Sequence, residues 1–254
     1  MSAAFQWAGF LSDFTREALA RGFSPTVIHE AKAGPIMAWE RKADGPLVYL
    51  SAGIHGDEPA GPLALLELLR SDFFCQSNHW IICPALNPDG LVAHTRENAD
   101  GIDLNRDYFT RESQEADKHA AWLDTIGVPA LFVSLHEDWE TSGFYLYELN
   151  LTGGPTTHAY RIIEAVKPWF HPEPGPVIDG HDAYEDGWIY HASEPDIPTG
   201  WPEAIYIIKK GCPLSFTFES PSASPLPERV AALAAGVRAA CHESCLADAQ
   251  ARCS

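Results

Sequence analysis

Positively charged residues are scarce in this sequence. Its 254 residues include 17 Lys and Arg against 35 Asp and Glu, which gives a formal net charge of −18. Proteins that bind nucleic acids neutralise phosphates with clustered cations, and anionic membrane surfaces attract basic segments. The composition therefore argues against a nucleic acid and against a membrane surface as a partner. It leaves a small substrate open, because a pocket can carry a local charge opposite to that of the whole chain.

Long apolar runs and a secretion signal are also missing. The sequence has no run of the roughly 18 apolar residues that a membrane-spanning helix needs. The N-terminal stretch MSAAFQWAGFLSDFTREALA has no basic segment followed by an apolar core, which is the pattern of a signal peptide. We therefore expect a cytoplasmic protein whose six cysteines are reduced thiols.

The sequence has no internal repeat and no low-complexity tract, and 46% of its residues are hydrophobic. This composition and length predict a single α/β domain over residues 1–254. Short apolar runs typical of strands buried on both faces alternate with helical patterns. The expected strands are Thr26–Ala31, Pro35–Arg41, Leu47–Ala52, Trp80–Cys83, Ala130–Leu135, Phe144–Glu148, Ala204–Ile208 and Leu214–Phe218. The expected helices are Pro59–Leu69, Thr110–Thr125, Pro155–Trp169 and a segment from Ser224 to about Ala249.

This alternation predicts a three-layer α/β sandwich, in which a mixed, mostly parallel twisted sheet carries helices on both faces. Ligands of such sheets bind beyond the carboxyl ends of the strands. Polar side chains suited to chemistry follow the ends of four apolar runs: His55 with Glu58, Asn87, His136, and Glu219. We therefore expect the functional site at this edge of the sheet.

The segment HGDE, residues 55–58, joins a buried strand to a helix. Two histidines and one glutamate are a common ligand set of catalytic zinc, which keeps a fourth position for water. Gly56 permits a tight turn, so His55 and Glu58 can face one point, and His136 can supply the third ligand from another strand end. The pair H-x-x-E is frequent by chance, and the alternative is a pair of surface or helix-capping residues.

Five motifs together resemble the zinc carboxypeptidase superfamily, over about Val48 to Glu219. In chain order they read HGDE, NPDG, RENADGIDLNRDY, SLHED and TFES. The interval from Arg96 to Asn105 is most similar to the bacterial murein peptide amidase branch. The aspartoacylase and succinylglutamate desuccinylase branch shares much of the pattern.

The resemblance implies a role for seven residues. His55, Glu58 and His136 would hold one zinc ion, Arg96 would stand beside the scissile carbonyl, Asn105 and Arg106 would bind a substrate carboxylate, and Glu219 would be the general base. Each role is chemically sound for the residue type, since a carboxylate can move a proton between water and a leaving amine and arginine can bind a carboxylate through two parallel bonds.

Each role also has a simpler alternative. Glu219 could be an exposed acid at a strand end, and Arg96 a surface arginine in a polar loop. Asn105 and Arg106 could stabilise their own loop, with Asp103 or Asp107 pairing with Arg106.

Other polar residues near these motifs have no settled role. Glu137 and Asp138 could orient a ligand or attract a second metal, although we expect a single ion. Tyr184 and Tyr190 are candidates for an assisting tyrosine in the long segment His171–Glu203. We expect His181 and His191, in the same segment, to be solvated or part of a lid rather than ligands.

The sequence thus predicts a zinc metallopeptidase that cleaves a peptide or amide bond near a free carboxylate, with a small peptide as substrate. The alternative is a zinc-dependent deacylase of N-acyl amino acids, and a third is a binding protein that has lost catalysis. Retention of the three candidate ligands together with Arg96 and Glu219 argues against the third.

Overall fold

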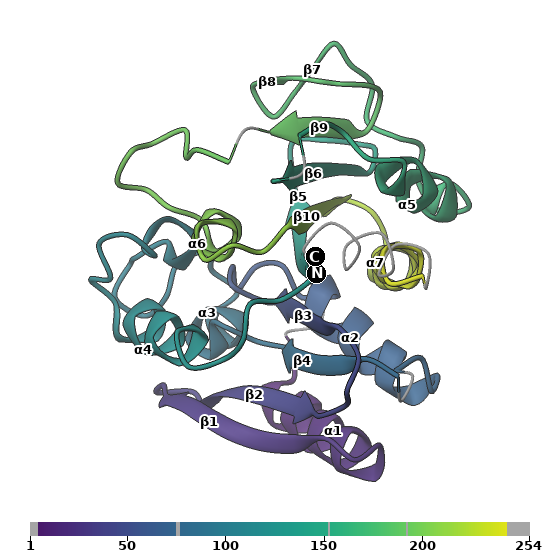
Figure 1. Ribbon diagram of the computed structural model, residues 1–254. Coiled ribbons are helices and arrows are strands. Elements are labelled where there is room, and N and C mark those ends of the chain that lie inside the picture. Colours follow the sequence, from purple (N-terminus) through teal and green to yellow (C-terminus); the bar gives the residue numbers. More distant parts are fainter. Residues whose placement is uncertain (1–4, 75–76, 152, 192, 243–254) are drawn as a thin grey trace.

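The computed structural model describes residues 5–74, 77–151, 153–191 and 193–242. An eight-stranded sheet runs through the molecule in the order β1-β2-β4-β3-β5-β10-β6-β9 (Figure 1). Its strands are β1 (Ser24–Glu30), β2 (Pro35–Arg41), β3 (Leu47–Ala52), β4 (His79–Cys83), β5 (Leu131–Asp138), β6 (Tyr145–Asn150), β9 (Trp188–His191) and β10 (Leu214–Pro221). A small hairpin of β7 (Val177–Ile178) and β8 (His181–Asp182) forms a separate two-stranded sheet.

The centre of the sheet is parallel. Strands β4, β3, β5 and β10 pair in parallel, β1, β2 and β4 pair antiparallel, and β6 pairs antiparallel with β10. The central strands are buried on both faces, as in β5, where only the last residue is partly exposed. This is the burial that continuous apolar runs indicate. The predicted fold class, a mostly parallel mixed sheet in an α/β protein, is confirmed.

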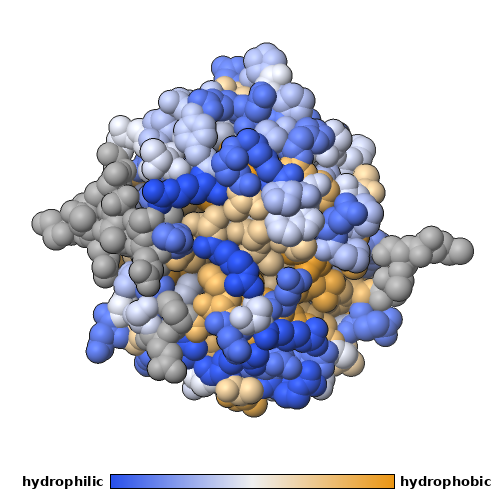
Figure 2. Space-filling view, turned by 90° about the vertical axis from the view of Figure 1, so that its right-hand side faces the viewer, coloured by the Kyte–Doolittle hydropathy of each residue, from blue (hydrophilic) through white to orange (hydrophobic). Residues whose placement is uncertain are grey.

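Helices cover both faces of the sheet (Figure 1). One layer holds α1 (Trp7–Ala20), α2 (Ala60–Arg70), α5 (His158–Val166) and α7 (Leu226–Ala240), whose apolar side chains share one core cluster. The other layer holds α4 (Gln114–Leu123) and α6 (Glu203–Lys209), beside the short helices α3 (Pro88–Ala93) and η1 (Leu104–Arg106). Figure 2 shows the side of the molecule where the first layer lies, with apolar surface across the middle and hydrophilic surface above and below it.

One predicted strand is wrong. Residues 204–208 belong to helix α6, which begins after Pro202 and carries Glu203 in its first turn. All residues from Glu203 to Ile208 are buried. A short helix that is apolar all round has no periodic pattern, so its sequence cannot be told from that of a buried strand. The N-terminal helix α1 was not predicted either.

The long segment before α6 contains β7, β8 and β9 rather than one irregular loop. Within the described ranges, no helix combines the length and the apolar character needed to cross a bilayer. The end of the predicted C-terminal helix, beyond residue 242, lies outside the described residues, and the single-domain organisation of residues 1–254 stays a prediction.

Candidate active site

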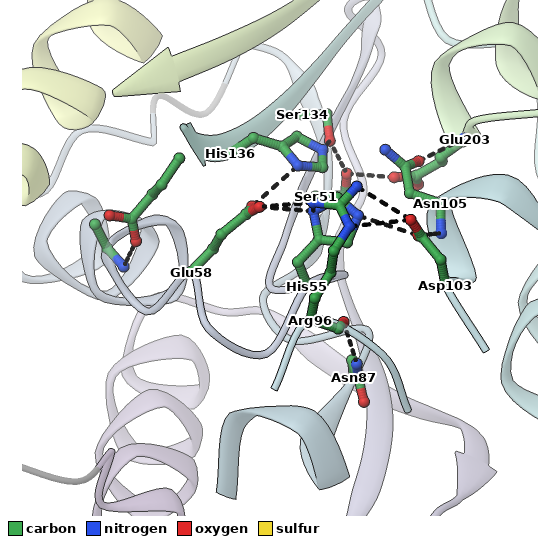
Figure 3. Close-up of polar contacts among 12 residues, drawn as sticks. Ser51, His55, Glu58, Asn87, Arg96, Asp103, Asn105, Ser134, His136 and Glu203 are labelled. Atoms are coloured by element: carbon green, nitrogen blue, oxygen red, sulfur yellow. Dashed lines mark hydrogen bonds and ion pairs between the residues drawn. The ribbon is translucent and has the colours of Figure 1, made fainter. Parts of the chain in front are cut away.

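The three predicted metal ligands lie together at the carboxyl ends of β3 and β5. His55 follows β3, Glu58 precedes α2, and His136 lies in β5. All three are buried, and one potential ligand atom from each lies within 4.8 Å of the others. Figure 3 shows the Glu58 carboxylate between the two imidazoles, with Oε1 at 2.7 Å from His55 Nδ1 and Oε2 at 3.0 Å from His136 Nδ1.

Gly56 has a steric reason to be glycine. A Cβ atom at this position would lie 1.9 Å from the backbone carbonyl carbon of Gly90, so the two backbones are in direct contact. Gly90 is held in turn by Asn87, which caps α3 by accepting a hydrogen bond from the Gly90 N–H at 2.9 Å. The HGDE turn and the NPDG helix start therefore pack as one unit.

The Nε2 atom of each imidazole has a hydrogen-bond partner within the protein. His55 Nε2 lies 3.2 Å from Asp103 Oδ1, and His136 Nε2 lies 3.0 Å from Ser134 Oγ. A proton on Nε2 leaves the Nδ1 lone pair available to a cation, and such a partner fixes the ring of a metal-binding histidine. Tetrahedral zinc separates nitrogen and oxygen ligands by about 3.4 Å. The three ligand atoms lie within 4.8 Å of one another, and two imidazoles with one carboxylate are a common ligand set of zinc, so the cluster suits a divalent metal of the zinc class.

The electrostatics of the cluster favour a cation as well. Burial alone would raise the pKa of Glu58, but the two imidazoles beside it lower that pKa to about 2. The carboxylate is therefore ionised at neutral pH. Burial lowers the pKa of His55, but the Glu58 charge and the Asp103 hydrogen bond outweigh this effect and raise it to about 9. A bound cation would displace this proton, because metal ligands must be deprotonated.

Arg96 lies against the cluster. Its Nη1 is 3.3 Å from His55 Nδ1 and 3.7 Å from Glu58 Oε1, and its Nε donates to Asp103 Oδ2 at 3.1 Å. Asp103 thus holds both a candidate ligand and the candidate carbonyl-binding cation. Sequence reasoning missed this role, although Asp103 opens the DLNR motif that the resemblance had singled out.

Glu219 lies beside His136 on the neighbouring strand. The parallel register of β10 on β5 pairs Glu219 with His136, and the antiparallel register on β6 pairs it with Tyr145. Residues paired in this way project from the same face of a sheet. Burial raises the pKa of Glu219, and the negative charge of Glu58 adds to the effect. A carboxylate with a raised pKa is a better proton acceptor.

The seven predicted site residues line one cavity of about 410 Å³. Asn105 is buried, and its side-chain oxygen accepts a hydrogen bond from the Glu203 N–H at 3.0 Å. Arg106 is exposed, and its Nη1 donates to the Asn105 carbonyl oxygen at 2.9 Å. The cavity therefore joins a candidate metal cluster to an amide and a guanidinium group.

The acids next to these motifs have structural partners. Asp107 does not pair with Arg106, because its carboxylate accepts hydrogen bonds from Thr110 Oγ1 and from the start of α4 at Glu112 and Ser113. Asp103 pairs with Arg96.

The two acids after His136 do not join the cluster. Glu137 accepts a hydrogen bond from the Ala60 N–H at 2.6 Å and pairs with Arg229, while Asp138 accepts one from Tyr145 at 2.9 Å.

The tyrosines in the cavity are not those considered from the sequence. Tyr184 is 52% exposed and packs on Trp188, and Tyr190 does not line the cavity. Tyr145 and Tyr147 of β6 do line it. Alternate residues of a strand share a face, so the sequence of β6 places Tyr145 and Tyr147 on the same face. Which face carries the site becomes visible only when β6 pairs with β10.

A buried hydrogen-bonded chain connects the candidate metal cluster to α6. Behind His136, Ser134 Oγ lies 3.2 Å from Ser51 Oγ, which lies 2.7 Å from Glu203 Oε2. Glu203 is 1% exposed and also accepts a hydrogen bond from Tyr49 at 2.7 Å. The chain therefore reaches from His136 to a carboxylate in the interior (Figure 3). Glu203 was missed because the sequence placed it at the end of a loop.

The Glu203 carboxyl makes stability depend on pH. Burial raises its pKa to about 7, although hydrogen bonds from Ser51 and Tyr49 oppose the shift. Below the unfolded pKa near 4.5 both states hold the proton, and between pH 4.5 and 7 only the folded state does. The free energy of unfolding therefore falls as pH rises through this window, by on the order of 3 kcal/mol.

Glu203→Gln should remove this dependence. In urea unfolding of metal-free protein from pH 4.5 to 8, we expect the wild type to lose about 3 kcal/mol more stability than the variant. Glu194→Gln, at an exposed acid, serves as the control and should follow the wild type. Parallel curves for the wild type and Glu203→Gln would contradict a raised Glu203 pKa.

Comparisons with known sequences agree with the motifs. A family model of the succinylglutamate desuccinylase/aspartoacylase catalytic domain matches residues 44–127. Carboxypeptidase SOL1 of Arabidopsis thaliana is 35% identical over 80 residues, which are 27% of this chain and 16% of that protein. Murein peptide amidase A of Escherichia coli K12 is 35% identical over 72 residues, which are 28% of this chain and 29% of that protein. The matched region thus spans less than a third of either relative.

Solved structures share the fold over most of the chain. A crystal structure of a candidate metallopeptidase from Shewanella amazonensis has a TM-score of 0.82 at 22% identity, covering 93% of this chain and 92% of that chain. A metallo-carboxypeptidase from Burkholderia cenocepacia has a TM-score of 0.65 at 20% identity, covering 91% of this chain and 66% of that chain. The sequence matches and the shared fold together support the resemblance to the zinc carboxypeptidase-like superfamily that the motifs indicate.

Proposed function

We propose that this chain is a zinc-dependent, carboxypeptidase-like hydrolase that cleaves a peptide or amide bond near a free carboxylate. One observation carries the proposal: His55 and His136 turn their Nδ1 atoms to opposite oxygens of the buried Glu58 carboxylate, with Glu219 on the adjacent strand. The partner would be a small peptide, and one derived from peptidoglycan is a natural candidate, given the match to murein peptide amidase A.

His55, Glu58 and His136 would hold the ion, and Zn²⁺ in such a site lowers the pKa of a water ligand from 15.7 to roughly 7. Glu219 would accept a proton from the attacking water and return it to the leaving amine nitrogen. Arg96 would donate to the carbonyl oxygen as negative charge develops there. One preorganised donor of this kind contributes about 3–4 kcal/mol to transition-state stability.

Arg106 and Asn105 would anchor the substrate through its terminal carboxylate. The guanidinium group can donate two parallel hydrogen bonds to a carboxylate, and the Asn105 amide can add another. Arg106 is exposed to solvent at the cavity, so a substrate can reach it without rearrangement of the chain.

Amidation of the substrate should test this anchor. Converting the terminal carboxylate to a carboxamide is expected to lower kcat/KM about 10- to 100-fold, because a charge-assisted hydrogen bond contributes about 1.5–3 kcal/mol. In Arg106→Ala the two substrates should become nearly equal, whereas Arg16→Ala, on the surface of α1, should keep the preference. Equal rates on both substrates in the wild type would overturn the anchor.

Deacylation of an N-acyl amino acid is the second candidate. It is favoured by the match of residues 44–127 to the desuccinylase/aspartoacylase catalytic domain. The same residues would serve, because the scissile bond is again an amide near a carboxylate.

A hydrolysis screen of the zinc-loaded protein separates the two candidates. It would compare peptides with free carboxyl ends, muropeptide fragments, and N-acetyl or N-succinyl amino acids at equal concentration. We expect the peptides to be cleaved faster, and turnover of the N-acyl amino acids alone would select the second candidate.

A further inference from the structure

A second cluster of potential metal ligands lies where the cavity opens to solvent. His181 of β8, His191 at the end of β9 and Asp196 in the following turn line the same cavity as Glu219, and we call them the mouth cluster. One nitrogen or oxygen atom from each lies within 4.8 Å of the others. The Asp196 side chain is 65% exposed, while those of His181 and His191 are 25% and 14% exposed. The mouth cluster is thus half-buried and open to ions from solution.

The mouth cluster repeats the geometry of the buried cluster. Asp196 turns Oδ1 to His191 Nε2 at 3.1 Å and Oδ2 to His181 Nε2 at 3.6 Å, so one carboxylate again lies between two imidazoles. The two rings are 5.0 Å apart, the same separation as between His55 and His136. Both distances to the carboxylate lie close to the roughly 3.4 Å that tetrahedral zinc imposes on its ligands.

Tyr147 fixes the two mouth imidazoles. Its ring packs edge-on against His181 at 5.4 Å and against His191 at 6.0 Å. Its hydroxyl donates to Asp179, so a second carboxylate lies near the mouth cluster. Rings that are already oriented lose less entropy on binding an ion, and the nearby negative charge favours a cation.

We propose that His181, His191 and Asp196 form a second site for a divalent cation of the Zn²⁺ class. Imidazole and carboxylate ligands suit zinc and its neighbours among the transition metals rather than magnesium or calcium. This assignment differs from the sequence-based expectation that both histidines are solvated or part of a lid. It does not depend on the reaction that the cavity catalyses.

A cation at the mouth cluster would tie the turn of residues 193–202 to β8 and β9. Asp196 lies in this turn, and so does Gly200, where an added Cβ would lie 3.6 Å from the side chain of Arg106. Gly200 therefore lies beside Arg106, the candidate anchor of the substrate. A bound ion would hold this wall of the cavity in place.

Metal stoichiometry of the full-length chain tests the site. We expect two Zn²⁺ per chain in the wild type after titration and gel filtration, one in Asp196→Asn, one in His55→Ala and none in the double variant. Asp196→Asn alters an exposed side chain, so loss of folding does not confound it. Asp182→Asn is the matched control, because Asp182 is an exposed aspartate next to His181 in β8. This variant should retain two Zn²⁺ per chain.

The variants separate failure of this site from failure of the buried one. A single ion in the wild type that His55→Ala removes would overturn the mouth cluster as a metal site, and so would two ions in Asp196→Asn. Unchanged stoichiometry in His55→Ala would instead overturn the buried ligand set.

Hydrogen exchange gives an independent readout. In His55→Ala, Zn²⁺ should slow the exchange of amides in residues 193–202, and in the double variant it should not. Equal exchange in His55→Ala with and without Zn²⁺ would overturn the proposed effect on the turn.

Discussion

Glu219→Gln is expected to lower kcat by roughly 10²- to 10⁴-fold while the zinc content stays unchanged. Glutamine has nearly the shape of glutamate but cannot accept a proton at neutral pH. Glu219 does not belong to the His55, Glu58 and His136 cluster, so its substitution leaves the ligands in place. The measurement is a steady-state rate on the substrate identified by the screen, with metal content determined on the same sample.

Glu140→Gln is the control for this substitution. Glu140 is an exposed acid at the cavity, and we expect its variant to keep nearly the wild-type rate. If Glu219→Gln also turned over at nearly the wild-type rate, Glu219 would not be the general base. A parallel fall in metal content would point to a supporting role for Glu219 in the cluster instead.

His55→Ala should remove the metal from the buried cluster and with it the activity. His55 supplies one of three ligand atoms, and two ligands hold zinc far more weakly than three. The experiment is cleanest in an Asp196→Asn background, where the mouth cluster does not contribute to the zinc content. We expect less than a tenth of the zinc of the Asp196→Asn parent after dialysis.

His171→Ala provides the matched histidine control. His171 is exposed and does not line the cavity, so its variant should retain the zinc of the parent. Full zinc content in His55→Ala would contradict the ligand assignment, whatever happened to the rate. Loss of zinc in both variants would mean that the measured metal is not specific to the buried cluster.

The parallel centre of the sheet could be predicted because its strands carry a strong signal. The predicted strand Leu47–Ala52 has the observed bounds of β3, and the predicted strand Leu214–Phe218 begins where β10 begins and ends three residues before Pro221. Helix α6 was misread because burial on all sides removes the helical period from its sequence. Helix α1 was missed because only three of its residues, Phe10, Phe14 and Ala18, are buried.

The candidate site was predictable to the extent that function selects recognisable residue types in fixed motifs. All seven predicted residues line one cavity, but their supporting residues were not predicted. Asp103, Ser134 and Glu203 act through contacts that depend on tertiary structure, as when Ser51 of β3 and Ser134 of β5 meet in register. Tyr147 and the mouth cluster come together only after β6, β8 and β9 have folded beside one another.

The position of Glu137 has a consequence for how the site can come apart. This residue follows His136 in β5, accepts a hydrogen bond from the first residue of α2, and pairs with Arg229 of α7. Glu58 lies two residues before α2. The buried Glu137 carboxylate therefore joins β5 to both α2 and α7. Detachment of α2 would break this junction and separate Glu58 from His136 in the same event. Release of a tightly held ion should therefore proceed through a cooperative opening of this region rather than through the swing of a single side chain.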